Sequence, residues 1–355
     1  MTRRAVVVGM GVAGLTCARL LADRGWVVQV WDLGDLADPP LVLNEVTGQL
    51  LRDLWGPAPL TDAHRLDTRM VRWHPGPPTA VPQAGLVVDG ATLRRRLLER
   101  LAGDGVEARE VPPVELAGQV AALGRGTVVD ASGRAARVTT GSGAARELIG
   151  HRQVVAASVR LRPSARQDTC HMETVPGGWV FLAPTGGDRA VLQAMSTDTS
   201  TPPDDVLTRL LAGTELIDAQ IMEIRGPASA FPAGPQRCAP SAGETSGVSW
   251  IAIGDAAIAL DPVAGDGVGH GLRGALLAVA VLDTGRADAV EHYRSRLDEA
   301  FSTHLRRCLA CYAGFDGPGW AREQAAMERA ARELGRRPEP LRYGLSGRRL
   351  VPLHR

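Results

Sequence analysis

The sequence predicts an α/β fold in which a parallel-sheet domain is interrupted by a mainly antiparallel sheet domain and followed by C-terminal helices. Three observations support this prediction. A strand–turn–helix–strand pattern opens the chain, alternating β-type runs fill residues 154–231, and helical periodicity returns after residue 267. With 355 residues, 45% of them hydrophobic, the chain is long enough for more than one core.

The N-terminal segment has the pattern of a nucleotide-binding turn. A strand at 5–8 runs into Gly-x-Gly-x-x-Gly, a helix follows to about residue 23, and a second strand covers 26–31. Such glycines permit a tight turn, let the backbone approach a pyrophosphate and let the helix pack on the strand, while an acid after the second strand binds a ribose. The helix N-terminus presents free N–H groups to the phosphates. The cofactor-binding residues expected here are Gly9, Gly11, Val12, Ala13, Gly14 and Asp32.

A second glycine-rich segment favours FAD over NAD. A buried strand ends at Gly254, and a Pro-Val-Ala-Gly-Asp-Gly-Val-Gly stretch then opens a helix at about residue 267. We expect Asp255 to reach a ribityl or ribose hydroxyl and the helix N-terminus to face the negative charge of a reduced isoalloxazine ring. The cofactor contacts expected here are Gly254, Asp255, Pro262, Gly265, Gly267, Val268 and Gly269.

A third stretch, Val129-Asp130-Ala131-Ser132-Gly133-Arg134, resembles the Asp-Ala-Ser/Thr-Gly-Arg fingerprint of the FAD-dependent monooxygenase and halogenase superfamily, which has the para-hydroxybenzoate hydroxylase type of fold. Residues 173–179 and 254–272 resemble its tryptophan-halogenase-like branch, which also includes flavoproteins that hydroxylate peptidyl tryptophan. The resemblance implies further FAD contacts at Asp130, Ala131, Gly133 and Glu45.

The full expectation is a Rossmann-type FAD-binding domain with an inserted mainly antiparallel β-sheet substrate domain and C-terminal helices. The FAD-binding domain is discontinuous and is expected to comprise residues 1–65, 85–150 and 244–285. The substrate-binding sheet domain is expected to comprise residues 66–84 and 151–243. Residues 286–355 are expected to form a C-terminal helical region and a loosely ordered tail.

The absence of lysine bears on the reaction, because all 40 basic residues are arginine. The resemblance implies that a standard halogenase carries an active-site lysine and a Trp-x-Trp-x-Ile-Pro motif, which Trp179-Val180-Phe181-Leu182-Ala183-Pro184 matches only in part. We therefore expect an oxidoreductase of the monooxygenase type. It would hydroxylate an indole- or phenol-like substrate, free or bound to a peptide or carrier, through a flavin C4a-hydroperoxide. A halogenase-like enzyme and an FAD-dependent dehydrogenase or double-bond reductase remain alternatives.

The candidate catalytic residues are Glu173 and His171, which share a face if their segment is a strand. Either could serve as a base, and Glu173 also matches the branch pattern. Trp179 and Phe181 share a face in the same way and are candidate walls of the substrate pocket, although both would suit a core equally well.

Composition and motifs indicate which partners, metals and cellular location to expect. The net charge of +1 gives no reason to expect nucleic acid or an anionic membrane. No second dinucleotide motif is visible, so we expect NAD(P)H to act as a transient donor or a separate flavin reductase to act as partner. The Cys308-x-x-Cys311 pair suits a packed helix face better than a metal site, and no metal is expected. The chain shows no signal-peptide pattern and no membrane-spanning stretch, so a cytoplasmic location is expected.

Overall fold

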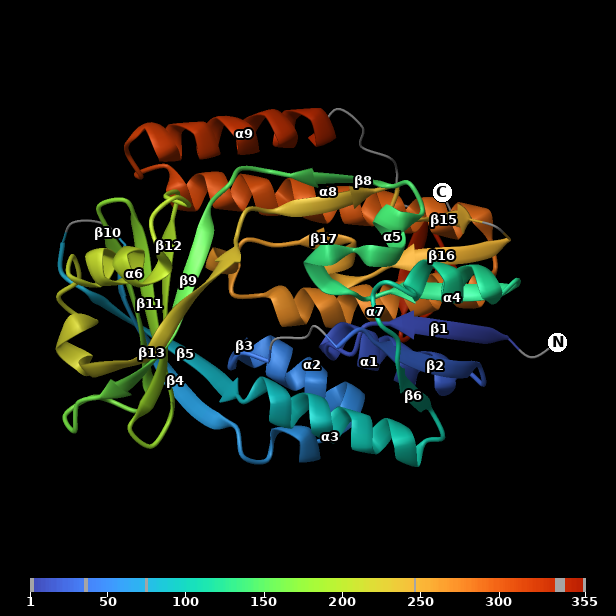
Figure 1. The fold of residues 1–355 in the computed structure, drawn as a ribbon, viewed down its shortest axis with the longest axis horizontal. Helices are drawn as coiled ribbons and strands as arrows, with labels where there is room; N and C mark the ends of the chain where they lie inside the picture. Colours follow the sequence, from blue (N-terminus) through green and yellow to red (C-terminus); the bar gives the residue numbers. More distant parts are fainter. Residues whose placement is uncertain (1–2, 35–37, 74–75, 246, 336–341, 354–355) are drawn as a thin grey trace.

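The computed structural model describes residues 3–34, 38–73, 76–245, 247–335 and 342–353. Two large sheets lie at opposite ends of the molecule, and the C-terminal helices run along one side of both (Figure 1). This arrangement confirms the predicted α/β fold with an inserted, mainly antiparallel sheet and C-terminal helices.

The first large sheet has six strands in the order β15-β16-β7-β1-β2-β6. Five of them are parallel, and only the edge strand β15 is antiparallel. Their bounds are β1 (Arg4–Val8), β2 (Val27–Asp32), β6 (Glu107–Glu110), β7 (Gly126–Asp130), β15 (Ala242–Thr245) and β16 (Val248–Ala252). Helices α1 (Val12–Ala22), α3 (Gly90–Gly103) and α7 (Gly267–Thr284) pack on it through buried aliphatic side chains. Strands that are far apart in the chain thus build one mainly parallel sheet, as the sequence predicts.

The second large sheet has eight strands in the order β13-β9-β12-β11-β10-β4-β5-β3, and only the β10–β4 pair is parallel. Their bounds are β3 (Leu41–Asn44), β4 (His64–Arg72), β5 (Thr79–Val88), β9 (Gln153–Leu161), β10 (Thr169–Val175), β11 (Gly178–Gly186), β12 (Arg189–Ser196) and β13 (Ile221–Pro232). Helix α6 (Pro203–Leu211) covers one face with Val206, Leu207 and Leu210. The opposite face looks toward the six-stranded sheet (Figure 1).

Two elements that the sequence patterns do not predict join the two halves. Strand β3 pairs with β5 at the end of the second sheet, and α2 (Glu45–Trp55) follows it at once. The Asn44 side chain accepts a hydrogen bond from the Thr47 N–H at 2.8 Å and so caps α2. The chain therefore crosses from the eight-stranded sheet to helix α2 beside the candidate cleft, which Asn44 itself lines.

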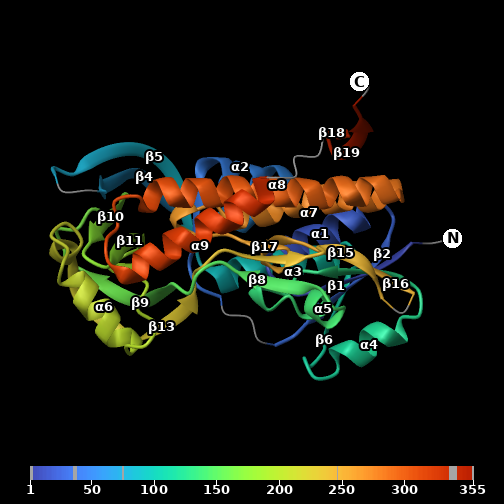
Figure 2. The ribbon, with the colours of Figure 1, turned by 90° about the horizontal axis from the view of Figure 1, so that it is seen from above.

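The C-terminal region consists of two long helices and a hairpin. Helices α8 (Ala287–Tyr312) and α9 (Pro318–Gly335) pack against each other over the sheets (Figure 2). The expected loose tail instead contains a hairpin of β18 (Tyr343–Ser346) and β19 (Arg349–Pro352), anchored by a bond from the Tyr343 hydroxyl to Asp288. No helix within the described residues is long and apolar enough to span a membrane.

Smaller elements complete the fold. A three-stranded sheet contains β8 (Ala145–Leu148), β14 (Gln236–Ala239) and β17 (Ile258–Ala259). Short helices are α4 (Leu116–Ala122) and α5 (Arg137–Gly141), together with single turns at Ala58–Leu60, Gly133–Ala135, Asp218–Gln220, Gly254–Ala256 and Pro262–Ala264.

Candidate active site

The first glycine turn adopts the arrangement that its spacing predicts. Gly11 precedes α1, and no side chain caps the N-terminus of this helix. The first turn of α1 also contains no acidic residue. The N–H groups of that turn are therefore available to an anionic ligand. A Cβ on Gly14 would lie 2.2 Å from the carbonyl oxygen of Gly9, so only glycine lets α1 approach the turn this closely.

The third fingerprint joins the same turn through its backbone. The Ala131 N–H donates to the Val8 carbonyl oxygen at 2.8 Å. The Asp130 carboxylate, which the resemblance places along FAD, is fully buried and accepts hydrogen bonds at 2.6–3.0 Å from the backbone N–H and hydroxyl groups of Ser132 and Thr139. These four bonds occupy both carboxylate oxygens, so Asp130 stabilises the loop of residues 131–139. Contacts with a ligand would then come from the neighbouring residues.

Asp32 ends β2 at the same edge of the sheet. One of its oxygens accepts a hydrogen bond from the Gly34 N–H at 3.0 Å, which leaves the other oxygen for a ribose hydroxyl. Glu45, expected to contact flavin, is exposed at the first turn of α2 and does not line the cleft.

The second glycine segment lies next to the first. A Cβ on Gly254 would come within 3.2 Å of the Ala13 side chain in the first turn of α1. Beyond it, Asp261 accepts a hydrogen bond from the Val263 N–H at 2.8 Å and starts the Pro262–Ala264 turn. Helix α7 then begins at Gly267, again without a side-chain cap. Two uncapped helix N-termini thus lie near each other, and both leave backbone N–H groups available to an anionic ligand.

A cleft of about 430 Å³ separates this segment from the large antiparallel sheet. On one side it is lined by Asp255, Pro262, Gly265, Gly267 and Val268, all of them expected cofactor contacts. We call residues Leu260–Val268 the flavin loop, since they are the segment expected to face the ring. A larger hollow of about 600 Å³ lies between α4 and α5, but none of the expected site residues line it.

The opposite wall of the cleft is the inner face of the antiparallel sheet. It includes Trp179 and Phe181 on β11 and Met172 on β10, so both predicted pocket residues do line the cleft. Cross-strand register sets Phe181 opposite Met172 on one side and Gln193 on the other. The wall is therefore mostly apolar and partly aromatic, which suits a flat aromatic ligand.

The candidate bases Glu173 and His171 do not reach the cleft. Successive residues of a strand face opposite sides, and on β10 it is Cys170 and Met172 that line the cleft. Glu173 is 1% exposed and accepts hydrogen bonds from the backbone N–H groups of residues 215–217 at 3.0–3.3 Å and from Arg72 at 3.0 Å. This geometry corrects the expectation of a catalytic pair and gives Glu173 the role of holding the chain that follows α6.

His171 is buried on the same face as Glu173. Burial lowers the pKa of its imidazole, although Glu173 acts in the opposite direction. The side chain is therefore a neutral group at neutral pH, packed away from the cleft.

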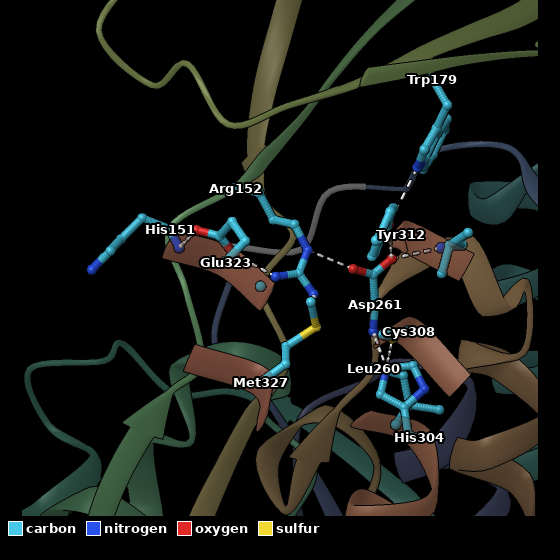
Figure 3. Close-up of polar contacts among 12 residues, drawn as sticks. His151, Arg152, Trp179, Leu260, Asp261, His304, Cys308, Tyr312, Glu323 and Met327 are labelled. Atoms are coloured by element: carbon cyan, nitrogen blue, oxygen red, sulfur yellow. Dashed lines mark hydrogen bonds and ion pairs between the residues drawn. The ribbon is translucent and has the colours of Figure 1, made fainter. Parts of the chain in front are cut away.

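A buried polar network, which the sequence patterns do not reveal, supports the cleft from behind (Figure 3). The Tyr312 hydroxyl on α8 accepts a hydrogen bond from Trp179 Nε1 at 3.2 Å and donates one to Asp261 Oδ1 at 2.9 Å. Arg152 lies between two carboxylates, with Nε 2.6 Å from Asp261 Oδ2 and Nη1 2.5 Å from Glu323 Oε2. Both C-terminal helices thereby hold the flavin loop and the aromatic wall in place.

His304 completes this network from α8. Its Nε2 accepts a hydrogen bond from the Asp261 N–H at 2.8 Å, which requires a neutral imidazole. Burial lowers the pKa of His304 to about 4, consistent with that role. Cys308 lies 3.3 Å from the same nitrogen within α8, and both cysteines of the Cys308-x-x-Cys311 pair are free thiols on one packed helix.

The fold and cleft together define a Rossmann-type domain joined to an antiparallel sheet, with the site between them. No protein-family model matches the chain, and no curated protein matches it in sequence.

Solved structures do share its fold. The peptidyl tryptophan dihydroxylase QhpG, essential for tryptophylquinone cofactor biogenesis, is 23% identical with a TM-score of 0.72 over 91% of this chain and 79% of its own. The flavin-dependent halogenase CmlS is 16% identical with a TM-score of 0.76 over 96% of this chain and 74% of its own. The myxobacterial FAD-dependent halogenase CndH is 16% identical with a TM-score of 0.71 over 95% of this chain and 90% of its own. At these identities the likeness establishes the fold, which is the one that the three sequence fingerprints predict.

Proposed function

We propose that this chain is an FAD-dependent monooxygenase that hydroxylates an electron-rich aromatic substrate. The observation that carries the proposal is the construction of the cleft. One side is the second glycine segment, which opens a helix with an uncapped N-terminus and packs against the first glycine turn through Gly254 and Ala13. The other side is an apolar wall with Trp179 and Phe181. Such a cleft suits a flavin and an aromatic molecule lying against each other.

The residues present fit FAD. The first turn of α1 would bind the pyrophosphate through its N–H groups, Asp32 would bind the ribose, and the flavin loop would contact the ring. Asp266 lines the same loop and forms an ion pair with Arg273 at 2.5 Å, which offsets its charge near the ring. When bound and reduced, the flavin would supply the oxygen chemistry. This chain's own residues would hold the substrate, keep water out and fix the aromatic wall.

Two features favour hydroxylation over the alternatives. The chain has no lysine, whereas the resemblance implies a lysine in standard halogenases. The similar structures include a tryptophan dihydroxylase as well as halogenases, so oxygen transfer is a chemistry that this fold accommodates. Neither Glu173 nor His171 reaches the cleft, so neither can deprotonate a substrate there. This favours substrates whose ring is electron-rich without deprotonation.

The test is the fate of molecular oxygen. The FAD-loaded protein would be reduced anaerobically, by NAD(P)H or by a separate flavin reductase, and mixed with ¹⁸O₂, bromide and an indole or phenol panel. We expect ¹⁸O in an aromatic product, detected by mass spectrometry. A brominated product would support the halogenase alternative. Hydrogen peroxide alone, with reduction of an alkene probe, would support a dehydrogenase or reductase.

A further inference from the structure

The inner wall of the cleft carries one cation that needs a partner. Arg69 lies on β4, directly opposite Cys170 of β10, and lines the cleft with Gln83 and Gln193. Among the described residues, no carboxylate forms an ion pair with Arg69, and its Nε is buried without a hydrogen-bond partner. Its neighbour within the wall is the Cys170 thiol, which cannot neutralise a guanidinium.

The other charges of the cleft are already compensated. Arg134 forms an ion pair with Asp255 at 4.0 Å and donates to the carbonyl oxygens of Gly234 at 2.8 Å and Leu260 at 3.1 Å. Asp261 is paired with Arg152, and Asp266 with Arg273. The described part of the cleft therefore places compensated acids on the flavin-loop side and an uncompensated guanidinium on the sheet side.

A guanidinium in such a setting selects for a planar oxyanion. It presents a rigid fork of N–H donors that matches a carboxylate, and such charged bonds are stronger than neutral ones. The amide of Gln83, on the adjacent strand β5, can donate to a carboxylate as well. Met172 and Phe181, on the next two strands of the same wall, suit an aromatic ring.

We propose that Arg69 is a specificity-determining residue that binds the carboxylate of a free aromatic acid and so turns the ring of the substrate toward the flavin loop. The inference rests on the proposed function for the identity of the substrate ring. It excludes an amide or thioester as the preferred form, because an acyl group joined to a peptide or carrier has lost the anionic oxygen that Arg69 would bind.

The experiment compares one acid with its own amide. Indole-3-propionate and indole-3-propionamide would be titrated into the FAD-loaded, oxidised protein by isothermal titration calorimetry, which needs no turnover. We expect the acid to bind about tenfold or more tightly than the amide. Arg69→Gln should bring the two affinities together by weakening the acid alone. Arg65→Gln, an exposed arginine on the same strand, should keep the full preference.

Three results would overturn the inference: equal binding of acid and amide by the wild type, an undiminished preference in Arg69→Gln, or no binding of either probe. The first would favour a substrate attached through its carboxyl group. Thermal unfolding and FAD content of each variant would verify that the cleft is intact. An acid preference that depends on Arg69, in a protein that forms no ¹⁸O product, would reject the monooxygenase and keep the carboxylate site. Formation of the ¹⁸O product without a preference for the acid would keep the monooxygenase and reject the carboxylate site.

Discussion

The Tyr312 hydroxyl lies 3.2 Å from Nε1 of Trp179 and accepts its proton in a hydrogen bond. The same hydroxyl donates to Asp261 at 2.9 Å. Burial raises the pKa of Tyr312 far above its ordinary value, so the hydroxyl keeps its proton and remains a donor. One phenol of α8 therefore connects the aromatic wall of the cleft with the loop expected to face the flavin, and the positions of the two are coupled (Figure 3).

Tyr312→Phe should loosen this coupling while keeping the ring, which packs 4.6 Å from Trp320. The change leaves the Trp179 N–H without a buried partner and removes one of the two hydrogen bonds to Asp261 Oδ1, so we expect a loss of about 1–3 kcal/mol in the free energy of unfolding. In turnover, less product should form per hydrogen peroxide released, because the wall no longer fixes the substrate. Tyr343→Phe removes a hydroxyl bonded to Asp288 outside the cleft and should leave that ratio unchanged. A wild-type ratio in Tyr312→Phe would contradict the coupling.

Arg152→Met tests the centre of the network. Arg152 is 1% exposed and separates the carboxylates of Asp261 and Glu323, which its loss would leave as uncompensated buried charges. Removing one member of a buried ionic group costs about 3–5 kcal/mol, and chemical unfolding measures it. Arg95→Met removes an exposed pair with Glu99 and should change stability by no more than about 0.5 kcal/mol. Equal effects of the two substitutions would show that the network contributes no stability.

The features that could be predicted from the sequence are those determined by residues close together along the chain. The turn at Gly9–Gly14 and the acid at Asp32 follow from spacing along one strand–turn–helix unit, and Trp179 with Phe181 follows from alternation along one strand. The partners of a buried charge are set by tertiary packing. Arg152 meets Asp261 across 109 positions, and no local pattern signals that pairing.

The same limit explains the wrong role expected for Glu173. Alternation correctly puts it on one face with His171, but it does not say which face of the strand lines the cleft. That is decided by α6 and the residues after it, which cover the outer face of the sheet and place three N–H donors on Glu173.

Glu173→Gln should consequently act on stability and not on chemistry. The amide loses the charge that Arg72 and the three backbone donors share, and we expect about 1–3 kcal/mol of destabilisation in urea unfolding. Turnover per folded, FAD-loaded molecule should equal that of the wild type, because the side chain faces away from the cleft. A specific loss of turnover, with stability unchanged, would restore the catalytic role that the sequence suggested.

His304 should make the protein sensitive to acid. Its pKa is about 4 when folded and near 6.5 when unfolded, so the unfolded state binds the proton more readily. The contribution is fully present above pH 6.5 and is lost as the pH falls from 6.5 toward 4. Between about pH 7 and about pH 5 this loss amounts to about 2 kcal/mol in the free energy of unfolding.

His304→Gln retains an acceptor for the Asp261 N–H, and urea unfolding at both pH values should show a smaller loss of stability. Burial lowers the pKa of His270 to about 4 as well, so part of the dependence should persist. An undiminished loss in His304→Gln would place the sensitivity elsewhere.

Gly14→Ala tests whether the first glycine turn binds the nucleotide. The new methyl group would lie 2.2 Å from the Gly9 carbonyl oxygen, so α1 must move away from the turn that its N–H groups share. Phosphate binding needs those groups in place, and we expect FAD affinity to fall about tenfold or more, measured by flavin fluorescence on titration of the apoprotein. Gly118→Ala provides the control, because it is exposed in α4 with open space around the added carbon. It should leave FAD affinity unchanged and raise stability by about 0.5–1 kcal/mol. Unaltered FAD binding in Gly14→Ala would mean that the cofactor, if one binds, does not use this turn.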